Sequence, residues 1–117
     1  MVTIKERSRE FSKVEEYLMT VAPSIISMKD VEDNTVIPFD GLITFIDTKD
    51  DGEESEILSI ITPDKKVYSL QSQTFKRSLN DIINIMGENK FSIIKISGKT
   101  KAGRDFINCI LDVNSVE

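Results

Sequence analysis

Apolar and polar residues alternate along much of the chain in the pattern that predicts β-strands. The segments 56–62 (EILSIIT) and 67–72 (VYSLQS) are short apolar runs separated by the turn sequence 63–66 (PDKK). Because proline presets the backbone for a reversal, the pair predicts a β-hairpin. Upstream, residues 35–47 (TVIPFDGLITFID) are apolar on both parities, which predicts one long strand covered on both faces. Gly41 in this segment predicts a bulge or bend that lets a sheet curl.

The period changes over residues 73–86, where apolar side chains recur every three or four positions and predict a helix. The expected core face of this helix carries Phe75, Leu79, Ile82, Ile83 and Met86. Ser72 or Thr74 is the expected N-terminal cap, and Gly87 is placed to end the helix.

Two further strands are predicted after the helix, at residues 91–97 (FSIIKIS) and 105–113 (DFINCILDV), with the loop 98–104 (GKTKAGR) between them. The order is therefore three strands, one helix and two strands. A five-stranded barrel with a helix between its third and fourth strands is the OB arrangement. We therefore expect an all-β, OB-like barrel of five to six strands with one helix. An α+β sandwich with the same order of elements is the alternative.

The first twenty residues give no single pattern. Residues 1–13 are charged and weakly patterned, so we expect a loose arm or a short helix there. Residues 14–20 (VEEYLMT) suit a helix or an extra strand, because their apolar positions fit both periods. The expected organisation is an N-terminal arm over residues 1–13 and one OB-like binding domain over residues 14–117.

Composition excludes several classes of function. The chain has 117 residues and no histidine, so the commonest general base and the commonest transition-metal ligand are absent. Cys109 is the single cysteine and lies in an apolar strand, where we expect a buried, unreactive thiol in a reducing cytoplasm. No apolar run approaches the roughly 18 residues of a membrane span. We therefore expect no enzyme, no metal, no cofactor and no membrane association.

A cluster of cations stands out in a chain whose net charge is −5. An acidic balance argues mildly against nucleic acid, whose phosphates require cations. Residues 95–104 nevertheless contain basic residues and no acidic one, in the loop that OB folds commonly use to grip oligonucleotides. A solvated hairpin tip is the alternative. The candidate phosphate contacts are Lys95, Lys99, Lys101 and Arg104, with Lys65, Lys66, Lys76 and Arg77 as a second basic stretch.

Two aromatic residues are candidates for stacking on bases, although most aromatic side chains in a domain of this size belong to the core. Tyr68 alternates with a polar neighbour in its strand, and Phe106 stands close to the basic loop. An exposed ring at either position would contribute roughly 1–3 kcal/mol per stacked base.

Several motifs together resemble a known family. The chain resembles small single-stranded DNA-binding proteins in four places. These are Val67-Tyr68-Ser69 after a turn, the Ser72/Thr74-Phe75 start of the helix, the strand from Phe91 and the hairpin 98–104. The proteins that it resembles are those of phages and mobile elements of Gram-positive bacteria. Upstream, 17–20 (YLMT) and 27–30 (SMKD) extend the resemblance to most of the chain.

The resemblance implies an OB-type fold and a location in the cytoplasm of the bacterial host. It also implies that the protein binds single-stranded DNA independently of sequence. Such a protein coats and protects displaced strands during DNA replication or recombination. Replication or recombination proteins are further candidate partners, and the oligomeric state is left open. The alternative function is a non-catalytic adaptor of a phage or mobile element, because a fold does not fix a function.

Overall fold

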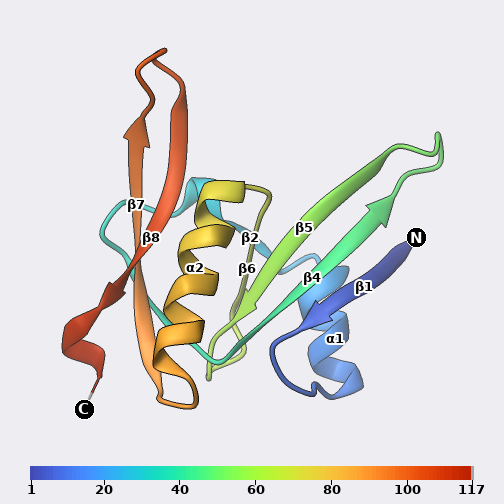
Figure 1. Cartoon of the computed structure of the whole chain (residues 1–117). Helices are drawn as coiled ribbons and strands as arrows, with labels where there is room; N and C mark the ends of the chain where they lie inside the picture. Colours follow the sequence, from blue (N-terminus) through green and yellow to red (C-terminus); the bar gives the residue numbers. More distant parts are fainter. Residues whose placement is uncertain (117) are drawn as a thin grey trace. The chain divides into compact units, whose positions relative to one another are not determined.

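The computed structural model describes residues 1–116 and shows a mostly-β, OB-like protein with two α-helices (Figure 1). Its strands form a five-stranded sheet of order β1-β4-β5-β6-β2 and a three-stranded sheet of order β3-β7-β8. The larger sheet contains β1 (Val2–Arg7), β2 (Ile26–Ser27), β4 (Gly41–Thr48), β5 (Glu54–Ile61) and β6 (Val67–Leu70). The smaller contains β3 (Val36–Phe39), β7 (Phe91–Lys99) and β8 (Asp105–Asp112).

The chain forms two compact units. Unit 1 comprises residues 1–28 and 40–71, with the five-stranded sheet and helix α1 (Lys13–Thr20). Unit 2 comprises residues 29–39 and 72–117, with the three-stranded sheet and helix α2 (Gln73–Met86). Short 3-10 turns lie at η1 (Met28–Asp30) and η2 (Val113–Ser115).

Unit 1 is held together by apolar packing between its sheet and α1, which contacts β5 and β6. Ser12 begins the helix with a capping box, because its hydroxyl accepts the N–H of Glu15 while the Glu15 carboxylate accepts the N–H of Ser12. Met19 on the helix is fully buried beside the sheet residues of the same cluster. The buried members of that cluster are Met19, Ile43, Phe45, Ile61 and Val67.

Unit 2 is built on α2 and its neighbour β8. The predicted helix is confirmed over Gln73–Met86: Ser72 caps its start by accepting the N–H of Phe75, and Gly87, at φ 60°, follows its end. Phe75 is fully buried, and its carbonyl accepts the thiol of Cys109 on β8. The helix therefore follows the third and precedes the fourth of the five long predicted strands, as expected for an OB-like chain.

The predicted hairpin is confirmed as β5 and β6, with Lys65 in the turn at a φ of 69°. The long strand predicted over 35–47 is instead divided at Asp40, so that β3 and β4 belong to different sheets. Gly41 begins β4 at this division. A Cβ atom there would lie 2.7 Å from Cζ of Phe11, so glycine is required for the ring to approach the strand.

The N-terminal residues differ from the expected loose arm or short helix. Val2–Arg7 form β1, which pairs antiparallel with β4 and contains a bulge between Ile4 and Glu6. Residues 14–20, which suited two periods, are helical in α1. The proposed start of the binding domain at residue 14 stays a prediction. No helix among residues 1–116 has the length and apolar character needed to cross a membrane.

Candidate nucleic-acid interface

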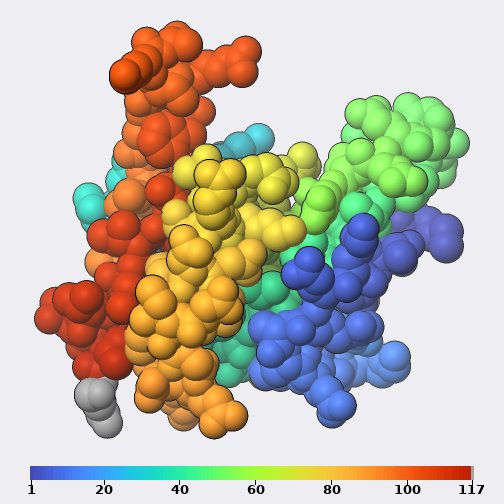
Figure 2. Space-filling view, viewed as in Figure 1, coloured from blue at the N-terminus to red at the C-terminus, as the bar shows by residue number. Residues whose placement is uncertain are grey.

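The basic segment forms the tip of the β7–β8 hairpin in unit 2. Pairing continues to Lys99 opposite Asp105, so the connecting turn is shorter than the loop predicted over 98–104. The N–H of Thr100 donates to the carbonyl of Arg104 at 2.9 Å, and the N–H of Gly103 donates to the carbonyl of Thr100 at 2.9 Å. The tip is therefore an ordered turn. It projects beyond the first turn of α2 in the space-filling view (Figure 2).

Three cations on this tip are accessible to a polyanion. The side chain of Lys99 is 73% exposed, and its ammonium lies 3.8 Å from a carboxylate oxygen of Asp105. A solvent-exposed pair at this distance contributes about 0–1 kcal/mol, so a phosphate can compete for the lysine. Lys101 and Arg104 are exposed, and neither forms an ion pair within the part of the chain that the structure describes.

Lys95 is a correction to the predicted phosphate contacts. Its side chain is 4% exposed, and its ammonium donates to the carbonyl of Val31 at 2.7 Å and to Asp33 Oδ1 at 3.0 Å. The hydroxyl of Ser97 donates to the same carboxylate oxygen at 2.6 Å. Hydrogen bonds from Ser97 and Lys95 lower the pKa of Asp33 below its usual value. Lys95 therefore holds the segment before β3 against β7, and its side chain is almost completely buried.

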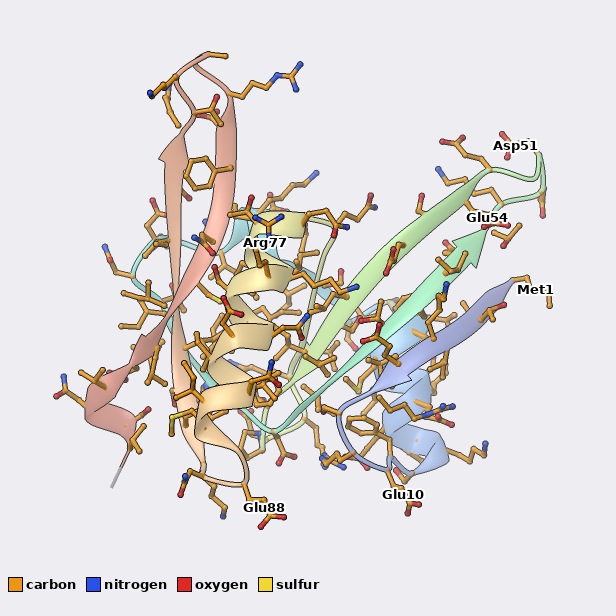
Figure 3. All side chains as sticks on the ribbon, viewed as in Figure 1. Met1, Glu10, Asp51, Glu54, Arg77 and Glu88 are labelled. Atoms are coloured by element: carbon orange, nitrogen blue, oxygen red, sulfur yellow. The ribbon has the colours of Figure 1, made fainter. Side chains whose placement is uncertain are left out.

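The second basic stretch is divided between the two units. In unit 1, Lys65 and Lys66 are exposed in the β5–β6 turn, and the Lys65 ammonium pairs with a Glu15 carboxylate oxygen at 2.9 Å. Hydrogen bonds from Arg9 and Lys65 hold the pKa of Glu15 far below its usual value. In unit 2, Lys76 and Arg77 lie on α2, where the exposed Arg77 is labelled in Figure 3.

The two candidate stacking residues also lie in different units. Tyr68 is half-buried in β6, opposite Ile60. Phe106 is half-buried in β8, opposite Gly98. A Cβ atom on Gly98 would lie 2.6 Å from Cζ of Phe106 and 2.9 Å from its Cε1, so the ring lies directly against the glycine backbone. Gly98 therefore permits Phe106 to lie low across the hairpin, next to the cationic tip.

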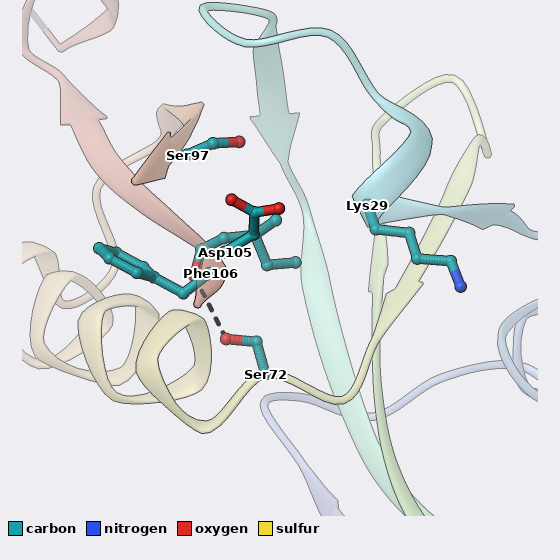
Figure 4. A pocket seen from close by; sticks show the side chains of 6 residues that line it. Lys29, Ser72, Ser97, Asp105 and Phe106 are labelled. Atoms are coloured by element: carbon teal, nitrogen blue, oxygen red, sulfur yellow. Dashed lines mark hydrogen bonds between the residues drawn. The ribbon is translucent and has the colours of Figure 1, made fainter. Parts of the chain in front are cut away.

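A hollow of about 570 Å³ adjoins Phe106 within unit 2 (Figure 4). It is lined by Lys29, Ser72, Ser97, Asp105, Phe106 and Ile107. The side chain of Asp105 is 84% exposed. An aromatic ring, several polar groups and nearby cations are the components from which single-strand binding surfaces are built.

Most of the lining residues were not predicted from the sequence. Asp105 could have been noticed, because it directly precedes Phe106. Lys29 and Ser72 carry no comparable signal, because they are remote from the hairpin in the chain and reach the hollow only through the fold.

Comparison with known families decides the identity. The model of the family described as Phage Single-stranded DNA-binding protein, of the Phi29 type, matches residues 8–112, which is nearly the whole chain.

The chain belongs to this phage single-stranded DNA-binding protein family. It is therefore a single-stranded DNA-binding protein, as the resemblance of its motifs indicated. No curated protein and no solved structure matches the chain. The family match identifies what is bound.

Proposed function

We propose that this single-stranded DNA-binding protein holds the strand on the β7–β8 hairpin of unit 2. Lys99, Lys101 and Arg104 contact phosphates, and Phe106 stacks on a base. The observation that carries this proposal is the exposed cationic tip beside an aromatic ring that lines a hollow. Both kinds of contact tolerate any sequence, because every nucleotide has a phosphate and every base has a π-face.

Further residues in each unit are proposed as DNA contacts. On α2, Lys76 and Arg77 line a polar hollow of about 240 Å³ together with Gln73, Asn80 and Asp81. In unit 1, Lys65, Lys66 and Tyr68 remain proposed contacts. Lys65 is the weakest candidate of these, because it has to leave Glu15 before it can bind a phosphate.

The protein acts by binding alone and catalyses no reaction, in the cytoplasm of the bacterial host during replication or recombination of phage DNA. The family match supports this assignment. Burial raises the pKa of the Cys109 thiol to about 12, so the thiolate needed for nucleophilic chemistry is scarce at neutral pH. Among residues 1–116, no three histidine, cysteine, aspartate or glutamate side chains gather to hold a metal ion.

The dependence of affinity on salt tests the phosphate contacts. In fluorescence anisotropy with labelled oligo-dT, the slope of log K against log salt falls by about 0.7 for each phosphate contact that is lost. We expect the triple variant Lys99→Ala, Lys101→Ala, Arg104→Ala to reduce the slope by about 2.

The matched control removes three exposed lysines elsewhere, with Lys5→Ala, Lys49→Ala and Lys90→Ala. It changes the net charge equally and should leave the slope nearly unchanged. Equal slopes for the two triple variants would show that the hairpin tip does not contact phosphates.

The stacking role of Phe106 can be read by fluorescence, because the chain contains no tryptophan. In Phe106→Trp, oligo-dT should quench the single tryptophan as bases stack on it. Phe11→Trp is the control, because Phe11 also lies against a glycine but has the Arg9 guanidinium 4.2 Å above its ring. Quenching of both variants, or of neither, contradicts a base platform at Phe106.

A further inference from the structure

We propose that the hollow beside Phe106 is a base subsite that prefers bases with an exocyclic amino group, namely dC, dA and dG, over dT. This inference rests on the proposed function, because it takes Phe106 as the residue on which the base stacks. It adds a modest base preference to a protein whose other contacts are indifferent to sequence.

The polar side chains around the hollow offer acceptors, because their hydroxyl protons are already committed. The hydroxyl of Ser97 donates to Asp33 Oδ1 at 2.6 Å. The hydroxyl of Ser72 donates to the carbonyl of Ile107 at 3.2 Å, the bond drawn in Figure 4, and accepts the N–H of Phe75. The carboxylate of Asp105 has acceptor oxygens only. Each of the three groups therefore meets a ligand as an acceptor or not at all.

The one cationic side chain among the lining residues does not add a hydrogen-bond donor near the ring of Phe106. Lys29 lines the hollow, but in Figure 4 its ammonium extends away from Phe106, Ser97 and Asp105. A phosphate has no donor to offer and would face the Asp105 carboxylate at close range. The hollow therefore excludes the phosphates and receives a base, while the phosphates remain with the cations at the tip.

Acceptors beside a stacked base select among bases by the groups on their edges. The amino groups of cytosine N4, adenine N6 and guanine N2 can donate to a carboxylate, and aspartate is a known acceptor for cytosine N4. Where cytosine carries its N4 amino group, thymine carries the carbonyl oxygen O4, which the Asp105 carboxylate repels. The ring N–H of thymine is the poorer donor to this carboxylate, because it lies between two carbonyl oxygens. The exposed fraction of Asp105, 84%, leaves its oxygens accessible to such a base edge.

The test compares oligo-dC with oligo-dU of equal length by competition against a labelled strand, at slightly alkaline pH and low salt. These homopolymers differ only at the pyrimidine edge, with an amino group in one and a carbonyl with a ring N–H in the other. Because every register of a homopolymer places the same base in the hollow, sliding of the strand does not blur the result. We expect the wild type to bind oligo-dC roughly three- to tenfold more tightly.

Asp105→Asn is the decisive variant, because an amide of the same shape can donate to a carbonyl as well as accept. It should bring the ratio of the two affinities to about one while raising both, since a negative charge near the strand is removed. Asp112→Asn is the matched control on the same strand. Its Oδ1 accepts the N–H of Asn114, and the amide oxygen of asparagine can keep that bond. The control should retain the wild-type ratio.

Two results overturn the base subsite and leave single-stranded binding by the hairpin in place. One is a wild-type protein that binds oligo-dC and oligo-dU equally well. The other is a preference for oligo-dC that Asp105→Asn does not change. Failure of Phe106→Trp to report stacking, with the preference for oligo-dC still present, overturns the proposed role of Phe106 instead. The two proposals therefore fail by different measurements.

Discussion

Two hairpins of this protein share one turn geometry and carry opposite charge. In unit 1, the N–H of Lys49 donates to the carbonyl of Glu53 at 2.8 Å, and the N–H of Gly52 donates to the carbonyl of Lys49 at 2.9 Å. The turn 100–104 in unit 2 repeats these two bonds, with Gly103 in the place of Gly52. Both glycines have positive φ, 86° and 82°. The backbone of the β4–β5 tip is thus equivalent to that of the β7–β8 tip.

The side chains make the two tips different. The acidic tip of β4–β5 carries Asp50, Asp51, Glu53 and Glu54 around Lys49, with Asp51 and Glu54 labelled in Figure 3. The tip of β7–β8 carries three cations and Asp105. Because charges are screened beyond about 8–10 Å at physiological salt, a ligand responds mainly to the charges within that distance of the place where it binds. The net charge of −5 therefore describes neither surface.

The largest effect is expected from reversing the charge of each tip in turn. We expect a triple variant with glutamate at the basic tip (Lys99→Glu, Lys101→Glu, Arg104→Glu) to bind oligo-dT about a hundredfold or more weakly at moderate salt, because the three proposed phosphate contacts become repulsive. Asp50→Lys, Glu53→Lys, Glu54→Lys makes the opposite change on the acidic tip and leaves the Asp51 bond to the N–H of Glu53 in place. It should raise affinity only a few-fold. An equal and opposite effect would show that only the total charge matters.

A smaller effect, on stability, distinguishes the buried Lys95 in strand β7 from the exposed Lys99 at the hairpin tip. Lys95→Ala removes the hydrogen bonds to Val31 and Asp33 and should lower the free energy of unfolding by about 2–4 kcal/mol, measured by urea denaturation. Lys99→Ala on the same strand should change stability by less than about 0.5 kcal/mol, because the ion pair that Lys99 forms with Asp105 is exposed. If Lys95→Ala left stability unchanged and reduced the salt slope, Lys95 would be a phosphate contact after all.

The smallest effect tests whether the two turns are equivalent. Gly52→Ala and Gly103→Ala should each cost about 1 kcal/mol of stability, because both residues have positive φ and a Cβ atom meets nothing within 4 Å in either turn. The two losses, measured by thermal or urea unfolding, should agree to within a few tenths of a kcal/mol. A clearly larger loss at one glycine would show that its turn is held by contacts other than the shared hydrogen bonds.

The elements predicted best are those with one unambiguous period and clear boundary residues. Helix α2 has the apolar spacing of a helix between Ser72 and Gly87, and β5–β6 has a proline-containing turn between apolar runs. The prediction of one continuous strand over residues 35–47 was wrong. Apolar residues at both odd and even positions predict such a strand, whereas the chain divides at Asp40 between two sheets. Strand β1 was missed because half of its residues are charged and a bulge interrupts its alternation.

In the candidate site, too, local sequence identified some residues correctly and could not show how others are placed. Lys99, Lys101 and Arg104 were predicted from local composition, and the structure exposes all three on one tip. Lys95 belongs to the same basic segment, but it lies on the face of β7 that also carries the buried Ile93. Its partners Val31 and Asp33 are more than sixty positions away in the chain. No local pattern in FSIIKIS marks this lysine as buried, because apolar residues occur on both parities there.

The family, the order of the principal strands and the helix, and the cationic turn in an acidic chain can all be inferred from the amino-acid sequence without a structure. These properties depend on local composition and spacing, which can be read along the chain. Folding is needed to establish which cations remain exposed, that Phe106 lies on Gly98, and that Lys29, Ser72 and Asp105 share one hollow. The reason is physical: exposure and hydrogen-bond partners depend on residues that are remote in sequence and meet only when the chain folds.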